Sequence, residues 1–95
     1  MGSEPFLVLA TFGTRDEAER AGEKLVEMRL AETGAVIPTV HSFYFLEGRM
    51  HRNHEALLLL RTSAERVGEV KDFLRAEGPD TAPESLAVAI DLTAR

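Results

Sequence analysis

The sequence predicts an α+β domain with its elements in the order β-α-β-β-α-β, and three observations support this prediction. Two segments carry apolar residues at helical spacing behind a helix-capping motif. Short apolar runs of strand length lie before and after these segments. Between them, one long hydrophobic hairpin runs from about Ala35 to Thr62. Two split β-α-β units of this kind form a ferredoxin-like sandwich, in which both helices cover one face of an antiparallel sheet.

The first strand and the first helix are predicted from local signals. Residues 6–12 form an apolar run between a proline and a glycine, which is typical of a strand covered on both faces. Thr14 and Glu17 have the spacing of a capping box, which begins a helix. Gly34 indicates the end of this helix. Its apolar stripe consists of Ala18, Ala21, Leu25 and Met28.

The central hairpin is predicted from a change in residue type. Between Ala35 and Leu46 the chain is rich in β-branched and aromatic residues, and Pro38 marks a bulge or an edge position. Residues 47–49 contain the glycine that a tight turn requires. The returning strand carries residues 56–60, which are apolar on both faces. This strand should therefore lie in the centre of the sheet.

The second helix and the last strand complete the order. Thr62 and Glu65 have the spacing of a second capping box, and Gly78 followed by proline indicates the helix end. The apolar face of this helix consists of Val67, Val70, Phe73 and Leu74. Residues 85–90 alternate larger apolar side chains with small ones, as a strand does.

The hairpin is too long for a domain of this size. A strand of about 12 residues extends for roughly 40 Å. A chain of 95 residues compacts to a radius of gyration of roughly 12–13 Å. Part of the hairpin must then pack on something outside its own domain, and the sheet face without helices stays apolar. We therefore expect an oligomer.

Length and composition restrict the class of protein. The length allows a single domain covering residues 1–95. Sixteen acidic side chains against eleven basic ones give a net charge of −5 without a basic cluster, so neither nucleic acid nor a membrane is an expected partner. The absence of cysteine excludes disulfides and thiolate metal sites. No signal peptide or membrane span is recognisable, so we expect a cytoplasmic protein.

Motifs for catalysis are missing from the sequence. There is no Gly-x-Ser-x-Gly elbow and no glycine-rich phosphate loop after a strand. Ser42 and Ser63 have no histidine and acid in a recognised arrangement. We therefore do not expect an enzyme.

Two histidines after the turn are the best candidates for metal ligands. His51 and His54 offer imidazoles, which suit copper and zinc, and Glu47 or Glu55 could add an oxygen. A spacing of three places two side chains on opposite faces of a regular strand, so convergence needs a turn or a bulge. The alternative interpretation is a solvated polar hairpin end. His41 lies on a strand and is expected to be structural.

A second set of candidates could line a cleft between subunits. Arg61 ends the central strand and would lie beside Tyr44 if the hairpin register brings both to the cleft, where a guanidinium binds carboxylate or phosphate. An ion pair with Glu47 of a neighbouring subunit is the alternative. Carboxylates of the C-terminal segment could form a cation site or remain solvated; these are Asp80, Glu84 and Asp91. The cleft candidates are Tyr44, Glu47, Arg61, Asp80 and Glu84.

Short motifs are distributed along nearly the whole chain. They are Thr11-Phe12, residues 17–20 (Glu-Ala-Glu-Arg), residues 29–31 (Arg-Leu-Ala), Ile37-Pro38, residues 42–44 (Ser-Phe-Tyr), Glu47-Gly48, Glu55 and residues 57–62 (Leu-Leu-Leu-Leu-Arg-Thr), with Pro79, Pro83 and Glu84 beyond them. In type and spacing they resemble the CutA family of divalent-cation tolerance proteins. The resemblance implies a ferredoxin-like subunit in a compact trimer similar to that of the PII signalling proteins. It also implies long hairpins packed across subunits and a role in tolerance of copper and other divalent cations.

Three positions depart from the family's pattern. Thr33 stands where the family has cysteine, Gly78 begins the segment where the family has His-Pro-Tyr, and Leu46 replaces a tryptophan. The resemblance thus implies copper or zinc as a bound metal, while two of the family's usual ligands are absent. Two alternatives remain open. One is a PII-like sensor in which Arg61 holds a small anionic ligand and the hairpin tip contacts a partner protein; the other is a structural docking module without a metal.

Overall fold

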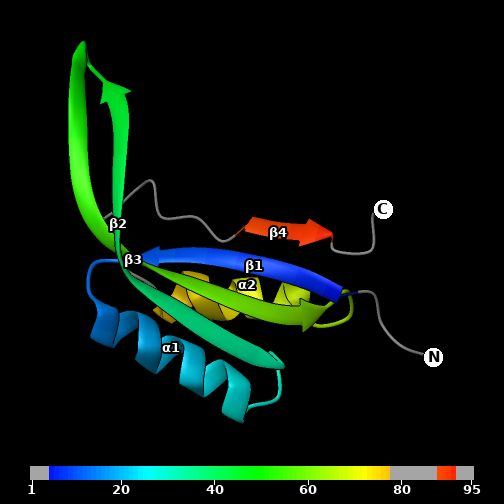
Figure 1. Ribbon diagram of the computed structural model, residues 1–95. Coiled ribbons are helices and arrows are strands. Elements are labelled where there is room, and N and C mark those ends of the chain that lie inside the picture. Colours follow the sequence, from blue (N-terminus) through cyan, green and yellow to red (C-terminus); the bar gives the residue numbers. More distant parts are fainter. Residues whose placement is uncertain (1–4, 78–87, 92–95) are drawn as a thin grey trace.

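A computed structural model of the chain describes residues 5–77 and 88–91. The elements follow the predicted order β-α-β-β-α-β (Figure 1). They are β1 (Pro5–Phe12), α1 (Arg15–Glu27), β2 (Thr33–Leu46), β3 (Arg49–Ser63), α2 (Val67–Glu77) and β4 (Val88–Asp91). The strands form one antiparallel sheet in the order β2-β3-β1-β4. The predicted α+β class is confirmed.

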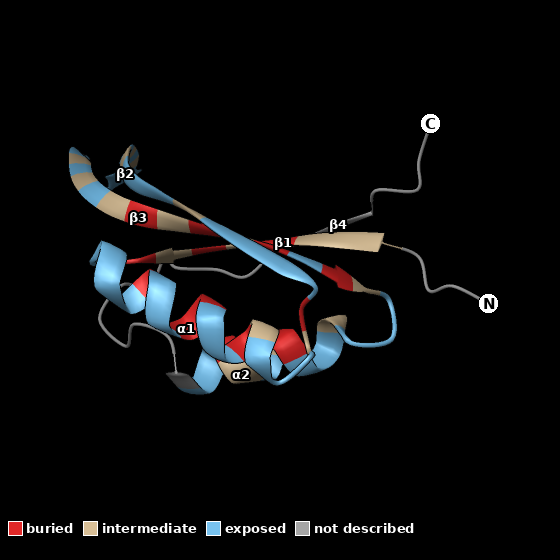
Figure 2. Ribbon diagram, turned by 60° about the horizontal axis from the view of Figure 1, so that its bottom comes forward, coloured by how far each residue is buried: buried red, intermediate tan, exposed pale blue. Residues whose placement is uncertain are grey.

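Both helices pack against the same face of the sheet, where the hydrophobic core lies (Figure 2). Alternate residues of β1 and β3 point into this core because side chains of a strand alternate between its two faces. The buried core consists of Val8, Ala10, Phe12, Ala18, Ala21, Leu25, Ala31, Ala56, Leu58, Leu60, Val70 and Leu74. On the opposite face, Leu57 and Leu59 are half-buried. Strand β3 lies between β2 and β1, so the prediction of a central strand is confirmed.

Helix α1 ends earlier than predicted. Its last residue is Glu27, and Gly34 lies inside β2, so the prediction of a stop at Gly34 was wrong. The backbone turns at Arg29, which adopts a positive φ of 65°. The amide of Arg29 donates to the Val26 carbonyl oxygen at 3.0 Å, and that of Leu30 donates to the Leu25 carbonyl oxygen at 3.0 Å. This pair of bonds is a Schellman motif, in which an arginine takes the position that glycine usually occupies.

The second capping box is also absent from the structure. Thr62 is still part of β3 and only 2% exposed, and α2 begins at Val67. The Thr62 hydroxyl donates to the carbonyl oxygen of Leu30 at 2.6 Å. The capping-box spacing of Thr62 and Glu65 therefore gave a wrong prediction, because the Thr62 hydroxyl bonds the distant Leu30 carbonyl oxygen instead of a helix amide. The first capping box is confirmed, since the amide of Glu17 donates to the Thr14 hydroxyl at 3.2 Å.

A break in the β2–β3 ladder lies at the predicted proline. The register shifts between Ile37 and Val40, and this interval contains Pro38, so the predicted bulge is confirmed. A bulge bends its strand and increases the local twist. In Figure 1 the hairpin turns away from the rest of the sheet near this point. Among the described residues, no helix combines the length and apolarity needed to cross a membrane.

Candidate functional site

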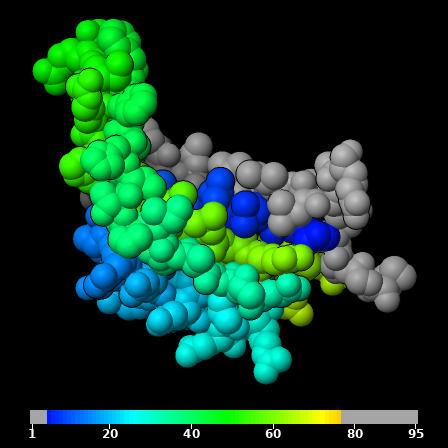
Figure 3. Space-filling model, in the orientation of Figure 1, coloured from blue at the N-terminus to red at the C-terminus, as the bar shows by residue number. Residues whose placement is uncertain are grey.

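The distal half of the hairpin projects from the domain as a two-stranded arm, which we define as residues 40–55. Strand β1 pairs with β3 only from Ala56 to Ser63, so no third strand pairs with the arm among the residues that the structure describes. The arm stands clear of the helices and of the rest of the sheet (Figure 3). It accounts for the elongated shape of the chain, whose extents are 49 × 30 × 21 Å. The hairpin overhang predicted from the sequence is confirmed.

A two-residue turn closes the arm and sets its register. Leu46 pairs with Arg49, so the turn consists of Glu47 and Gly48. Both residues have positive φ, 53° for Glu47 and 76° for Gly48. A type I′ turn requires this conformation at both central positions, and its twist matches that of the strands. The length of this turn determines which residues lie opposite each other throughout the arm.

The arm has two faces of different composition. Directly opposed residues share a face, because both side chains leave the ladder in the same direction. The face that we call the Phe face carries His41, Phe43, Phe45, Met50, Arg52 and His54. The face that we call the Tyr face carries Val40, Ser42, Tyr44, Leu46, Arg49, His51, Asn53 and Glu55. Phe43 and Phe45 are each 68% exposed, so the Phe face presents large apolar side chains to solvent.

The two predicted metal ligands lie on opposite faces of the arm. His51 belongs to the Tyr face, where its ring stacks on Tyr44 with centroids 5.0 Å apart and planes at 6°. The Nε2 atom of His51 also lies 3.3 Å from the carbonyl oxygen of Leu46. His54 belongs to the Phe face. The rings of His51 and His54 therefore do not converge within one chain, and joint metal binding by them stays a prediction.

The structure brings a different pair of histidines together. His54 is the direct cross-strand partner of His41, and their ring centroids lie 4.4 Å apart with planes inclined by 53°. Both residues are exposed. The sequence interpretation treated His41 as structural and did not consider this pair. Among the described residues, no group of three or more His, Cys, Asp or Glu side chains is arranged to hold a metal ion.

Arg61 lies far from two other cleft candidates, Tyr44 and Glu47, within one chain. Tyr44 pairs with His51, and His51 and Arg61 are ten positions apart on β3, which corresponds to about 33 Å along the strand. Glu47 lies at the tip of the arm. Only the arm of another subunit could bring Tyr44 or Glu47 to Arg61, so this cleft stays a prediction. Asp80 and Glu84 lie outside the described residues, and Asp91 lies in β4 in register with Phe6.

The surroundings of Arg61 do not favour an anion. Its Nε lies 3.8 Å from an Oε1 of Glu32, and both side chains are mostly exposed. A pocket of about 360 Å³ beside it also contains Arg66 and Glu65. Two guanidinium groups thus face two carboxylates. The local charges cancel, and an exposed pair of this kind contributes at most about 1 kcal/mol to stability.

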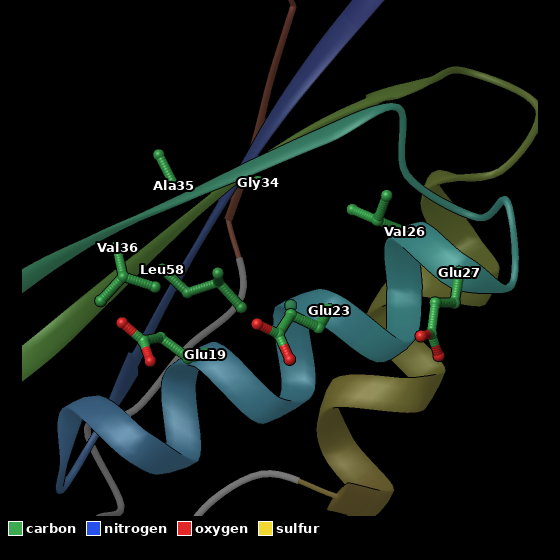
Figure 4. A pocket seen from close by; sticks show the side chains of 9 residues that line it. Glu19, Glu23, Val26, Glu27, Gly34, Ala35, Val36 and Leu58 are labelled. Carbon is green, nitrogen blue, oxygen red and sulfur yellow. The ribbon is translucent and has the colours of Figure 1, made fainter.

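A groove between α1 and β2 was not predicted from the sequence. It has a volume of about 510 Å³ and an apolar floor that includes Val26, Val36 and Leu58 (Figure 4). The acidic side chains along its rim are Glu19, Glu23 and Glu27. Their spacing of four residues places them on one side of the helix, and this spacing is visible in the sequence.

Fold and arm together define a class of small α+β proteins with an antiparallel sheet, two helices on one face and a projecting hairpin arm. The family model of the CutA1 divalent ion tolerance protein matches residues 6–95. The divalent-cation tolerance protein CutA of Thermus thermophilus is 32% identical over 84 residues, covering 88% of this chain and 82% of that protein. CutA of Archaeoglobus fulgidus is 30% identical over 84 residues, covering 88% and 81%. The chain belongs to the CutA divalent-cation tolerance family.

Solved structures of CutA proteins share the fold. The Cut A1 protein from Thermus thermophilus superimposes with a TM-score of 0.84 at 27% identity, covering 96% of this chain and 86% of that one. CutA from Xylella fastidiosa gives a TM-score of 0.86 at 27% identity, covering 98% and 88%. CutA1 from Ehrlichia chaffeensis gives 0.88 at 23% identity, covering 100% and 87%, and this likeness concerns the fold alone.

Proposed function

We propose that this CutA-family chain acts in the cytoplasm as a homotrimer that binds a divalent cation, copper or zinc, and that it is a binding protein rather than an enzyme. The exposed Phe face of the arm is the observation that supports association between subunits, and the number of three follows the resemblance to the CutA family. The relatives, named divalent-cation tolerance proteins, supply the class of ligand. Because the arm projects from the ferredoxin-like domain, the arm of one subunit could contact another subunit.

The arm is poorly stabilised within a single subunit. A two-stranded hairpin without a third strand or a covering helix is marginally stable in water. Its side chains also leave a large apolar area exposed, and complete burial of one phenylalanine stabilises a protein by about 1.5–3 kcal/mol. Docking of Phe43 and Phe45 on another subunit would therefore stabilise both the arm and the assembly.

The side chains of the arm suit a borderline metal ion. The chain has no cysteine, so its nitrogen ligands are imidazoles, which bind copper, zinc and nickel. All three histidines of the chain lie in the arm. A metal bound there would lie near the surfaces through which the subunits meet.

Native mass spectrometry tests both parts of this proposal. The metal-free protein should give the mass of a trimer, and a slight excess of copper should add about three metal ions per trimer. A monomer at micromolar concentration contradicts the assembly. If the protein is a trimer that takes up neither copper nor zinc, the proposed assembly stands and the proposed metal binding is wrong.

A further inference from the structure

We infer that His41 and His54 together form a copper site on the Phe face of the arm. This inference rests on the proposed metal binding and assigns it to specific residues. The two histidines are direct partners in the β2–β3 ladder, one on each strand. Their ring centroids lie 4.4 Å apart, and both side chains are exposed in the single subunit. The pair lies at the end of the Phe face nearest the domain, so a metal ion bound there would lie at the edge of the surface that the proposed trimer covers.

The separation of the two rings is close to the one that two imidazole ligands of a single metal ion require. A metal–nitrogen distance of about 2.0 Å and a distance of about 1.1 Å from nitrogen to ring centroid place the metal about 3.1 Å from each centroid. Two such rings at 90° have centroids about 4.4 Å apart, and at the tetrahedral angle about 5.1 Å. The observed 4.4 Å is close to these separations, so both rings can reach one metal ion after rotation of their side chains. For a given set of nitrogen ligands Cu²⁺ binds more tightly than Zn²⁺, so copper should bind more tightly than zinc.

The turn also holds the backbones of His41 and His54 in place before a metal ion binds. The tight turn at Glu47 and Gly48 fixes the register, and the ladder holds the two backbones at the spacing of paired strands. Only rotation of the exposed side chains is needed to aim one nitrogen of each ring at a common point. Two imidazoles leave the other positions of the metal to water.

His51 is not a member of this site. It lies on the Tyr face, stacked on Tyr44 and with its Nε2 beside the carbonyl oxygen of Leu46. It is nevertheless an imidazole of the same strand, three residues from His54. Replacement of His51 is therefore a matched control for replacement of His54.

Arg52 is the charged neighbour of the site on the Phe face. It lies two residues before His54 and is the cross-strand partner of Phe43. Residues two apart on a strand share a face, so the positive charge of Arg52 would oppose a cation bound by His54. Removal of this charge should strengthen metal binding.

Isothermal titration of the full chain with CuCl₂ and with ZnCl₂ tests the site. Wild type should bind about one copper per subunit. His41→Gln and His54→Gln should each weaken copper binding at least tenfold, His51→Gln should change it less than twofold, and Arg52→Gln should strengthen it. Thermal unfolding of each metal-free variant checks that the fold is kept. Paramagnetic broadening of the imidazole proton resonances by Cu²⁺ should affect His41 and His54 more strongly than His51.

The outcomes separate this inference from the proposed function. If wild type binds copper and His51→Gln weakens it as much as His54→Gln, or if His41→Gln has no effect, the inferred site is wrong while metal binding stands. If wild type binds neither metal, both the metal part of the proposed function and the site are wrong.

Discussion

A Cβ atom on Gly22 would lie only 2.8 Å from Cδ1 of Leu58. Gly22 is buried in the middle of α1, and Leu58 is a core residue of β3 that is 1% exposed. Real Cβ atoms essentially never approach another heavy atom so closely. The absence of a side chain at this position therefore allows α1 to pack directly on the central strand, and both residues line the groove between α1 and β2.

Gly22→Ala should destabilise the protein in spite of the better helix propensity of alanine. Alanine gains up to about 1 kcal/mol in a helix interior. The added methyl group collides with a buried leucine, and overpacking of a core costs about 1–3 kcal/mol. We expect a net loss of up to about 2 kcal/mol in the free energy of unfolding, measured by urea denaturation.

Gly68→Ala is the control for this prediction. Gly68 lies in α2, and nothing within 4 Å would meet its Cβ atom. This change should stabilise the protein by about 0.5–1 kcal/mol. Leu58→Ala should cost less in the Gly22→Ala background than in wild type, by at least about 0.5 kcal/mol. Strict additivity of the two changes would contradict the predicted collision.

Thr62→Val should destabilise the protein by about 1–3 kcal/mol, because the Leu30 carbonyl oxygen loses its donor in a partly buried position. Valine has nearly the shape of threonine, so packing changes little. Thr62→Ser keeps the hydroxyl and loses one methyl group, which costs about 0.8 kcal/mol. Denaturation curves give the free energy of unfolding of both variants. A valine variant as stable as the serine variant would disprove the role of the hydrogen bond.

Arg29→Gly should stabilise the protein by about 1 kcal/mol. A left-handed conformation costs an L-residue about 1–2 kcal/mol, and glycine avoids this cost, although it adds entropy to the unfolded chain. Arg29→Ala removes the charge and keeps the strain, so it should leave the melting temperature nearly unchanged. Equal effects of the two substitutions would show that charge rather than backbone conformation decides stability at this position.

The fold could be predicted from the sequence where local signals and tertiary packing agree. The capping box at Thr14 and the bulge at Pro38 were confirmed in this way. Two predictions failed for different reasons. Gly34 is a good helix stop by residue type, yet a local Schellman motif at Arg29 ends the helix five residues earlier. The hydroxyl of Thr62 bonds a carbonyl 32 positions earlier in the chain instead of capping a helix. A spacing rule contains no information on such distant partners.

The candidate site was predicted less completely than the fold, and the reason is the register. The predicted turn covered residues 47–49, whereas the structure closes the hairpin with residues 47–48 alone. This difference of one residue shifts every pair of the arm, and only the two-residue turn places His41 opposite His54 and Tyr44 opposite His51. The distance between Arg61 and the arm of a second subunit depends on how the subunits assemble, and the sequence pattern of one chain does not determine this.

Replacement of both exposed phenylalanines of the arm should dissociate the proposed trimer. Phe43→Ser with Phe45→Ser removes two side chains that are each 68% exposed in a single subunit, so the fold of the subunit should be kept. Their burial is worth about 1.5–3 kcal/mol each, and the dissociation constant should rise at least a hundredfold. Sedimentation velocity should then show monomers at micromolar concentration. Met28→Ser is the control, because Met28 is 50% exposed but follows α1, away from the arm, and this variant should sediment like wild type. If the double variant remains trimeric, the subunits associate through another surface, and the exposed Phe face does not hold the assembly together.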